Sequence, residues 1–176
     1  QSSFLMHLPI RIKVEGTDLL ETFTVSFFGH RYIDNFRKVE ERVERQVRQL
    51  IESHEFVEFL VGRDGDFDQI VSSAVIRAKK NIRDDNSVLI WVLPYPTSEL
   101  QNNDEEFHNY YDEIEICEEA SMAHPKSAFQ IRNRSMVDRS DLVIFCVEHE
   151  SGGAFQTLRY AQKKEKQIIN LSLEIE

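Results

Sequence analysis

The chain has 176 residues, 41% of them hydrophobic, and a formal net charge of −10 with an isoelectric point near 5.1. A chain of this length buries roughly two-thirds of its unfolded surface in one domain, so no second domain is required. The acidic balance argues against the nucleic-acid binding that depends on clustered Lys and Arg side chains. We therefore expect no nucleic-acid partner.

The cysteines and the apolar runs indicate a cytoplasmic protein without a membrane partner. Cys117 and Cys146 lie far apart, which indicates neither a disulfide framework nor a paired-cysteine metal site. No apolar run approaches the roughly 18 residues of a membrane span. Residues 2–9, SSFLMHLP, lack the basic leader and the long apolar core of a secretory signal.

Predicted strands and helices alternate in the first half of the chain. Residues 10–14 alternate between apolar and charged side chains, which predicts a half-buried edge strand within an N-terminal extension over residues 1–21. The run FTVSFF at 23–28 predicts a buried strand, and apolar residues then recur at helical spacing from Phe36 to Ile51. A strand, a helix and a strand follow at 56–61, 67–78 and 88–95.

The second half begins with a break in this pattern. Residues 96–127 are polar and without clear periodicity, which predicts a long loop that is either a functional lid or disordered. Periodicity resumes with a helix near 128–137, a strand at 142–147, a further helix and a last strand at 168–171. This order predicts a three-layer, Rossmann-like α/β domain over residues 22–176, with a mainly parallel sheet of about five strands.

Glycine recurs where the predicted strands end. In parallel sheets of this kind, ligands bind beyond the carboxyl ends of the strands, near the point where the strand order reverses. Three of the four strand exits contain glycine, in the segments FFGHRYID (27–34), VGRDGDFDQ (61–69) and HESGGAFQT (149–157). Glycine lets phosphate approach the backbone, and a helix N-terminus attracts it. A tight turn would explain the pair Gly152 and Gly153 equally well.

The strand exits supply the candidate binding residues. A basic or polar side chain follows a glycine at the first exit, and Asp68 at the second could accept hydrogen bonds from ribose hydroxyls. An exposed loop histidine is the alternative for His30. The candidates at these exits are Gly29, His30, Arg31, Gly62, Gly65, Asp68, Ser151, Gly152, Gly153 and Thr157.

Four segments together resemble the SLOG superfamily: FFGHR, VGRDGDFD, RNRSMVDRSDLVIF and SGGAFQTLRYAQKKEKQIINL, spread over about residues 24–171. These are Rossmann-like proteins grouped with the bacterial DNA-processing protein and the cytokinin-activating phosphoribohydrolases, and the YpsA-like branch is the most similar. The resemblance implies a pocket for a nucleotide or nucleotide-derived ligand. It also implies that Arg132 and Asn133 face that ligand, although a solvated basic helix surface would explain them too. Because such relatives commonly pair, we expect a homodimer.

The resemblance is incomplete at the glycine pair. In the phosphoribohydrolases this pair leads into a threonine and a glutamate that acts on the ribosyl bond. Gln156 and Arg159 stand at these two positions here. A guanidinium group cannot accept a proton at neutral pH, so hydrolysis by that route is in doubt. Our hypothesis is a sensor or regulatory protein that binds a nucleotide. The alternative is a hydrolase or transferase that uses one of the nearby carboxylates, Glu148, Glu150 or Asp68.

Acidic residues at the second exit do not form a calcium loop. Counted from Asp64, the positions that require glycine and a bidentate glutamate hold Gln69 and Val75. The simpler interpretation is that Asp66 or Asp68 caps the following helix, and Asp68 can also face a ligand. The histidines show no metal-ligand spacing, so we expect neither a metal site nor a bound cofactor.

Overall fold

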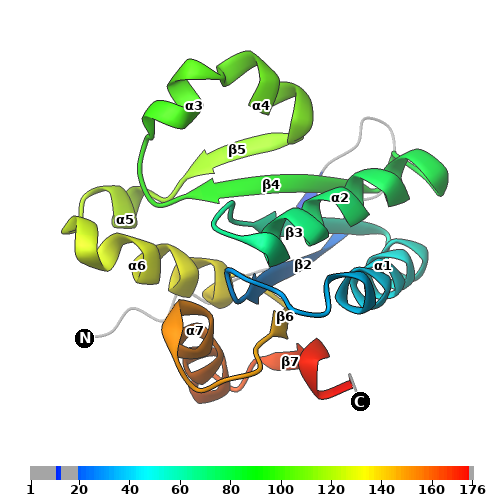
Figure 1. Ribbon diagram of the computed structural model, residues 1–176. Helices are drawn as coiled ribbons and strands as arrows, with labels where there is room; N and C mark the ends of the chain where they lie inside the picture. Colours follow the sequence, from blue (N-terminus) through cyan, green and yellow to red (C-terminus); the bar gives the residue numbers. More distant parts are fainter. Residues whose placement is uncertain (1–10, 13–19, 175–176) are drawn as a thin grey trace.

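The computed structural model describes residues 11–12 and 20–174, and six of its strands form one parallel sheet. The sheet order is β5-β4-β3-β2-β6-β7 (Figure 1). The strands are β2 (Leu20–Gly29), β3 (Phe56–Val61), β4 (Ser87–Leu93), β5 (Glu113–Ile116), β6 (Leu142–Cys146) and β7 (Gln167–Asn170). Every residue of β6 is buried, as expected for a central strand that is covered on both faces. The predicted Rossmann-like α/β fold is confirmed.

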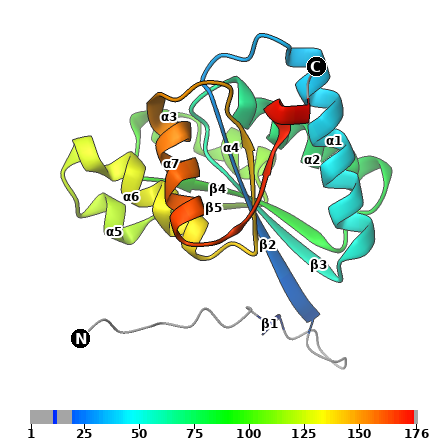
Figure 2. The ribbon, with the colours of Figure 1, turned by 90° about the horizontal axis from the view of Figure 1, so that it is seen from below.

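Helices cover both faces of the sheet and make three layers. α1 (Phe36–Ser53) and α2 (Asp66–Asn81) lie on one face, and α6 (Pro125–Asp138) and α7 (Gly152–Lys163) lie on the other (Figure 2). Successive strand side chains point to opposite faces. Phe27 accordingly packs in the core beneath α1 and α2, whereas its neighbour Phe28 packs in the core beneath α6 and α7.

The strand order reverses next to β2. From β2 the chain adds β3, β4 and β5 outward in one direction, and then returns to place β6 and β7 on the other side of β2. Gly29, the last residue of β2, pairs with Cys146, the last residue of β6. The two strands therefore end together, and their following loops diverge into helices on opposite faces of the sheet. This is the topological switch point at which ligands bind in such folds.

The long loop predicted over residues 96–127 is wrong. This segment contains α3 (Ser98–Asn102), α4 (Asp104–Tyr110), β5 and α5 (Glu118–Ser121), and β5 is a sixth strand of the sheet. Phe107 and Tyr111 pack against Trp91 of β4, with ring centroids 5.1 Å away in both cases. These elements have four to seven residues each. They are too short to show helical periodicity. The Phe107 and Tyr111 rings, which hold them in place, pack against Trp91 in a different element of the chain.

The remaining elements lie at the ends of the described chain. β1 (Arg11–Ile12) pairs antiparallel with the first two residues of β2, so it lies beside the start of an inner strand. Residues 10, 13 and 14 of the predicted edge strand fall outside the described residues. A 3-10 helix, η1 (Leu171–Glu174), follows β7.

Candidate functional site

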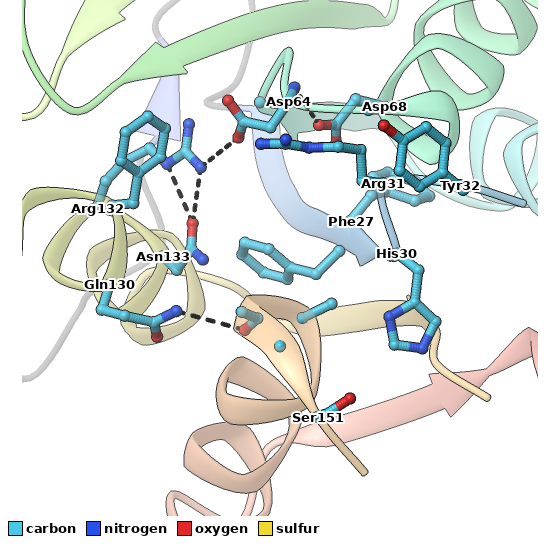
Figure 3. A pocket seen from close by; sticks show the side chains of 18 of the residues that line it. Phe27, His30, Arg31, Tyr32, Asp64, Asp68, Gln130, Arg132, Asn133 and Ser151 are labelled. Atoms are coloured by element: carbon cyan, nitrogen blue, oxygen red, sulfur yellow. Dashed lines mark hydrogen bonds and ion pairs between the residues drawn. The ribbon is translucent and has the colours of Figure 1, made fainter. Parts of the chain in front are cut away.

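A cavity of about 540 Å³ opens at the switch point (Figure 3). Its walls come from the segments that follow β2, β3 and β6, and from one side of α6. Eleven of the twelve residues predicted as binding residues line it, although their role in binding remains a prediction. They are Gly29, His30, Arg31, Gly62, Gly65, Asp68, Arg132, Asn133, Ser151, Gly152 and Gly153.

Thr157, the twelfth predicted residue, lies behind the cavity wall. Its side chain is fully buried. The hydroxyl Oγ1 accepts a hydrogen bond from Asn133 Nδ2 at 3.1 Å and donates one to the carbonyl of Gly153 at 2.9 Å. Thr157 therefore ties α6 to the first turn of α7 and does not belong to the cavity surface.

The glycines around the cavity are required for different reasons. A Cβ atom on Gly29 would overlap the Phe67 ring, and one on Gly65 would overlap the backbone of Arg31. Gly152 has a φ of +88°, a backbone conformation that favours glycine. A Cβ atom on Gly153, in contrast, would meet only the end of the Gln130 side chain, at 3.3 Å. The turn interpretation thus explains Gly152 but not Gly153.

The N-terminus of α7 presents a positive end to the cavity. Ser151 is its N-cap residue and makes no side-chain capping bond, and the first turn holds no acidic residue. The first N–H groups of a helix have no partner within it, and they carry roughly half a positive charge. With Ser151, Gly152 and Gly153 lining the cavity, this end suits an anionic group such as phosphate.

Arg132 organises the opposite side of the cavity. Its guanidinium group is buried, and it forms an ion pair with Asp64, with 2.7 Å between Nη2 and Oδ2. It also donates to Oδ1 of Asn133 at 2.9 and 3.1 Å (Figure 3). A further bond goes from Arg132 Nη1 to the carbonyl of Val92, at 3.1 Å. Arg132 therefore joins β4, α6 and the connection between β3 and α2 in one hydrogen-bonded network.

The carboxyl group of Asp68 lies in surroundings that favour its protonated form. Burial and the nearby charge of Asp64 raise the pKa of the Asp68 carboxyl group to about 7, although backbone N–H bonds and Arg132 oppose the shift. Asp68 accepts a hydrogen bond from the N–H of Asp64 at 2.7 Å, and Asp66 accepts one from the N–H of Ile33 at 3.0 Å. The predicted capping of the first turn is therefore wrong, because both carboxyl groups bind N–H groups that precede the helix.

His30 and His149 stack on each other beside the α7 end of the cavity. Their ring centroids are 3.6 Å apart, and the rings are nearly parallel at 10°. His30 Nε2 accepts hydrogen bonds from the backbone N–H groups of Glu148 at 3.0 Å and His149 at 3.4 Å. Burial, followed by the neighbouring His149, lowers the pKa of His30. His30 therefore holds the loop between β6 and α7 in place.

Sequence reasoning missed eight residues of the cavity wall. The sequence contained a signal for two of them. Phe129 and Gln130 lie about one helical turn before Arg132 and Asn133, which places all four residues on the same side of α6. The missed residues are Phe27, Phe28, Tyr32, Asp64, Phe129, Gln130, His149 and Ala154. Glu148 and Glu150, considered as catalytic carboxylates, are exposed and do not line the cavity.

The described residues hold neither a candidate metal centre nor a membrane-spanning helix. Within residues 11–12 and 20–174, no three His, Cys, Asp or Glu side chains gather in a way that could hold a metal ion. In the same part of the chain, no helix is both long and apolar enough to span a membrane.

Known structures share this fold. No family model and no curated protein matches the chain. DNA processing protein A from Helicobacter pylori, studied for its single-stranded DNA binding mode, is 19% identical with a TM-score of 0.57 over 83% of this chain and 63% of that one. DNA processing protein A from Streptococcus pneumoniae is 15% identical with a TM-score of 0.62, over 84% of this chain and 49% of that one. The molybdenum cofactor carrier protein from Chlamydomonas reinhardtii is 14% identical with a TM-score of 0.52, over 84% and 75%.

These comparisons correct one prediction made from charge. The expectation of no nucleic-acid partner is wrong, because a protein of the same fold binds single-stranded DNA. Net charge sums the whole surface, whereas phosphate can be recognised locally by a helix N-terminus or by a single arginine. The chain spans about half to two-thirds of the two DNA-processing proteins, and what it shares with them is the Rossmann-like fold.

Proposed function

We propose that this protein binds a nucleotide or nucleotide-derived ligand in the switch-point cavity, as a sensor or regulatory protein. The observation that carries the proposal is the uncapped, acid-free N-terminus of α7, which opens into the cavity at Gly152 and Gly153. A ligand phosphate placed there would accept backbone N–H bonds and interact favourably with the helix dipole.

The size of the cavity supports a ligand of one or two nucleotide units. Small-molecule sites typically enclose about 300 to 1,000 Å³, and this cavity has about 540 Å³. Proteins that share the fold are described as a DNA-binding protein and as a cofactor carrier, and both descriptions concern binding. Membership of the YpsA-like branch, which the sequence motifs suggested, is part of this proposal.

A titration of the Gly153→Asp variant tests the proposal. The added carboxylate would occupy the place of the phosphate and neutralise the positive helix end. Gly153 is the suitable position because its φ is not positive, so that a side chain does not strain the backbone. We expect calorimetry to detect binding of AMP or ADP-ribose to the wild type and none to Gly153→Asp.

Gly153→Ala is the matched control, since it adds a Cβ atom without charge. It should retain most of the affinity once the Gln130 side chain moves aside. A short single-stranded DNA is titrated in parallel, which separates a free nucleotide from a DNA strand as the source of the phosphate. Equal ligand affinity in the wild type and in a folded Gly153→Asp variant would refute the proposal.

A second candidate function is hydrolysis or group transfer on a nucleotide. It is favoured by Asp68, a carboxyl group in the cavity whose pKa of about 7 suits proton transfer at neutral pH. Arg159, which replaces the family glutamate, is exposed and does not line the cavity. Incubation with AMP, NAD and ADP-ribose, followed by chromatography, tests this function. A new product that disappears in Asp68→Asn would support it.

Three further expectations remain part of the proposal. The protein is expected to form a homodimer, to work in the cytoplasm and to use residues 22–176 as its nucleotide-binding domain. Both cysteines, Cys117 and Cys146, are free, which is consistent with a reducing compartment. Light scattering at micromolar concentration tests the dimer, and a monomer mass would overturn that expectation.

A further inference from the structure

The cavity has two chemically different ends. At the α7 end, Ser151, Gly152 and Gly153 lie at the positive end of the helix. At the end formed by the connection between β3 and α2, the carboxyl groups of Asp64 and Asp68 line the same cavity. Figure 3 shows these carboxyl groups on one side and Ser151 on the other. A ligand whose phosphate lies at α7 therefore presents a different, non-anionic group to the carboxyl groups.

Arg132 brings a buried hydrogen-bond donor to the end of the cavity that holds Asp64 and Asp68, which we call the acidic end. Its side chain is 4% exposed, and its four hydrogen bonds to Val92, Asp64 and Asn133 use four of the five guanidinium N–H groups. One N–H group of Nη1 is left without an acceptor among the described residues. Nη1 lies where a Cβ atom on Gly62 would meet it at 3.1 Å, and Gly62 also lines the cavity.

Asp68 brings a fixed acceptor to the same end. It stands on the first turn of α2, and it accepts backbone N–H bonds from Asp64 and Gly65. An ionised carboxylate has about four acceptor sites, so about two remain for a ligand. The helix and the two N–H bonds hold the carboxyl group in one orientation, which lowers the entropic cost of binding.

A hydroxyl group matches this combination of donor and acceptor. It donates one hydrogen bond and accepts others, whereas an ammonium group only donates and a phosphate group mainly accepts. Two adjacent hydroxyls can donate to one carboxylate, and the 2′-hydroxyl is the group that distinguishes ribose from deoxyribose. A ribonucleotide carries such a pair at the 2′ and 3′ positions.

We propose that Asp68 binds the 2′,3′-diol of a free ribonucleotide whose phosphate lies at the N-terminus of α7. Arg132 donates its remaining N–H group to one of the two hydroxyls. The cavity then prefers ribonucleotides to 2′-deoxyribonucleotides, and Asp68 determines this specificity. The inference rests on the proposed function, since it names the sugar that the nucleotide site accepts.

The test compares AMP with 2′-deoxy-AMP by calorimetry above the pKa of Asp68. We expect the wild type to bind AMP more tightly by a factor on the order of ten, because the deoxy ligand leaves charged and buried partners without a hydrogen bond. In Asp68→Asn this ratio should fall close to one. The asparagine keeps the size of the side chain and one oxygen for the Asp64 N–H, so the fold is retained. Asp66→Asn is the matched control, because it removes the same charge from the same helical turn but lies outside the cavity.

The outcomes separate this inference from the proposed function. If neither AMP nor 2′-deoxy-AMP binds the wild type, the proposed function fails. If both bind with equal affinity, the proposed function stands and the preference for ribose is refuted. A wild-type ratio retained in folded Asp68→Asn overturns the assignment to Asp68. A short oligoribonucleotide with a free 3′-diol should bind more weakly than AMP, and tighter binding would contradict the choice of a free nucleotide.

Discussion

Helices α2 and α7 begin at the same cavity in a similar way, yet they present opposite charges to it. α2 follows Gly65 and α7 follows Ser151, and neither of these N-cap residues makes a side-chain capping bond. The first turn of α2 holds two aspartates, whereas that of α7 holds no acidic residue. Carboxylates offset the partial positive charge of a helix N-terminus. Of these two helices, α7 therefore keeps its positive charge available to an anion, whereas α2 does not.

The two helix ends are also held in different ways. The aspartates of α2 accept N–H bonds from preceding segments, and these bonds fix the loops around its start. In α7 the fixing bonds reach the carbonyl of Gly153, from Thr157 and Gln130, and the loop before the helix is held by His30. The start of α7 is thus held through a carbonyl group of its first turn and through the loop that precedes it. Its N–H groups stay available for a ligand.

The largest expected effect comes from making α7 resemble α2. Ala154 is the third residue after the N-cap of α7, the position that Asp68 holds in α2. Ala154→Asp should weaken AMP binding on the order of 100-fold, because a carboxylate then competes with the phosphate inside the cavity. The same change should raise the stability of the helix by about 0.5 kcal/mol.

Calorimetry and thermal unfolding of Ala154→Asp measure these two opposite effects. Ala154→Asn adds nearly the same volume without charge, and should lose far less affinity than Ala154→Asp. If the two variants bind AMP equally well, the charge difference between the two helices does not determine where the anion binds.

The acidic end should depend on Arg132 for stability. Arg132→Met keeps an apolar stem but leaves the carbonyl of Val92 and the amide oxygen of Asn133 without their donor. We expect the free energy of unfolding to fall by about 2 to 3 kcal/mol, as is usual when buried acceptors lose their partners. Urea unfolding measures this change. Arg134→Met, on the exposed side of α6, should change it by less than about 0.5 kcal/mol.

Sequence patterns predicted those parts of the fold that are long and regular. The apolar stripe of α1 and the buried runs of β2, β3, β4 and β6 were recognisable because each spans several residues of one period. The region from α3 to α5 was missed since its elements are short and since Phe107 and Tyr111 find their partner, Trp91, in another element. Contacts of this kind leave no local pattern.

The same distinction applies to the cavity. Gly29, Gly65 and Gly152 were found because a glycine at a strand exit is visible in the sequence, although the packing and backbone reasons for them are not. The capping role expected for Asp66 was wrong, because its donor is Ile33, which lies 33 residues earlier. The stack of His30 on His149 likewise joins two exits, so it becomes visible only when β2 and β6 lie side by side.

A smaller effect is expected from the titration of Asp68. Its pKa of about 7 in the folded protein lies above the value of about 3.9 in an unfolded chain. Between these values the folded state keeps a proton that the unfolded state has lost, so that the contribution of Asp68 to stability falls as the pH rises. Asp68→Asn should therefore gain stability relative to the wild type from about pH 4 to pH 8, on the order of 1 kcal/mol. Thermal unfolding across this range measures the gain, and a constant difference would contradict the raised pKa.

The smallest effect concerns the loop that positions α7. His30 accepts two backbone N–H bonds through Nε2 and must be neutral to do so, which agrees with its lowered pKa. As the pH falls below about 6.5, the unfolded chain binds a proton before the folded one does, and the stability contributed by His30 is lost. His30→Ala should therefore cost about 1 kcal/mol near pH 8 and less near pH 5. Urea unfolding at the two pH values measures this cost, and amide hydrogen exchange at Glu148 and His149 shows whether the loop opens. An equal cost at both pH values, or unchanged exchange, would show that His30 does not hold this end of the cavity.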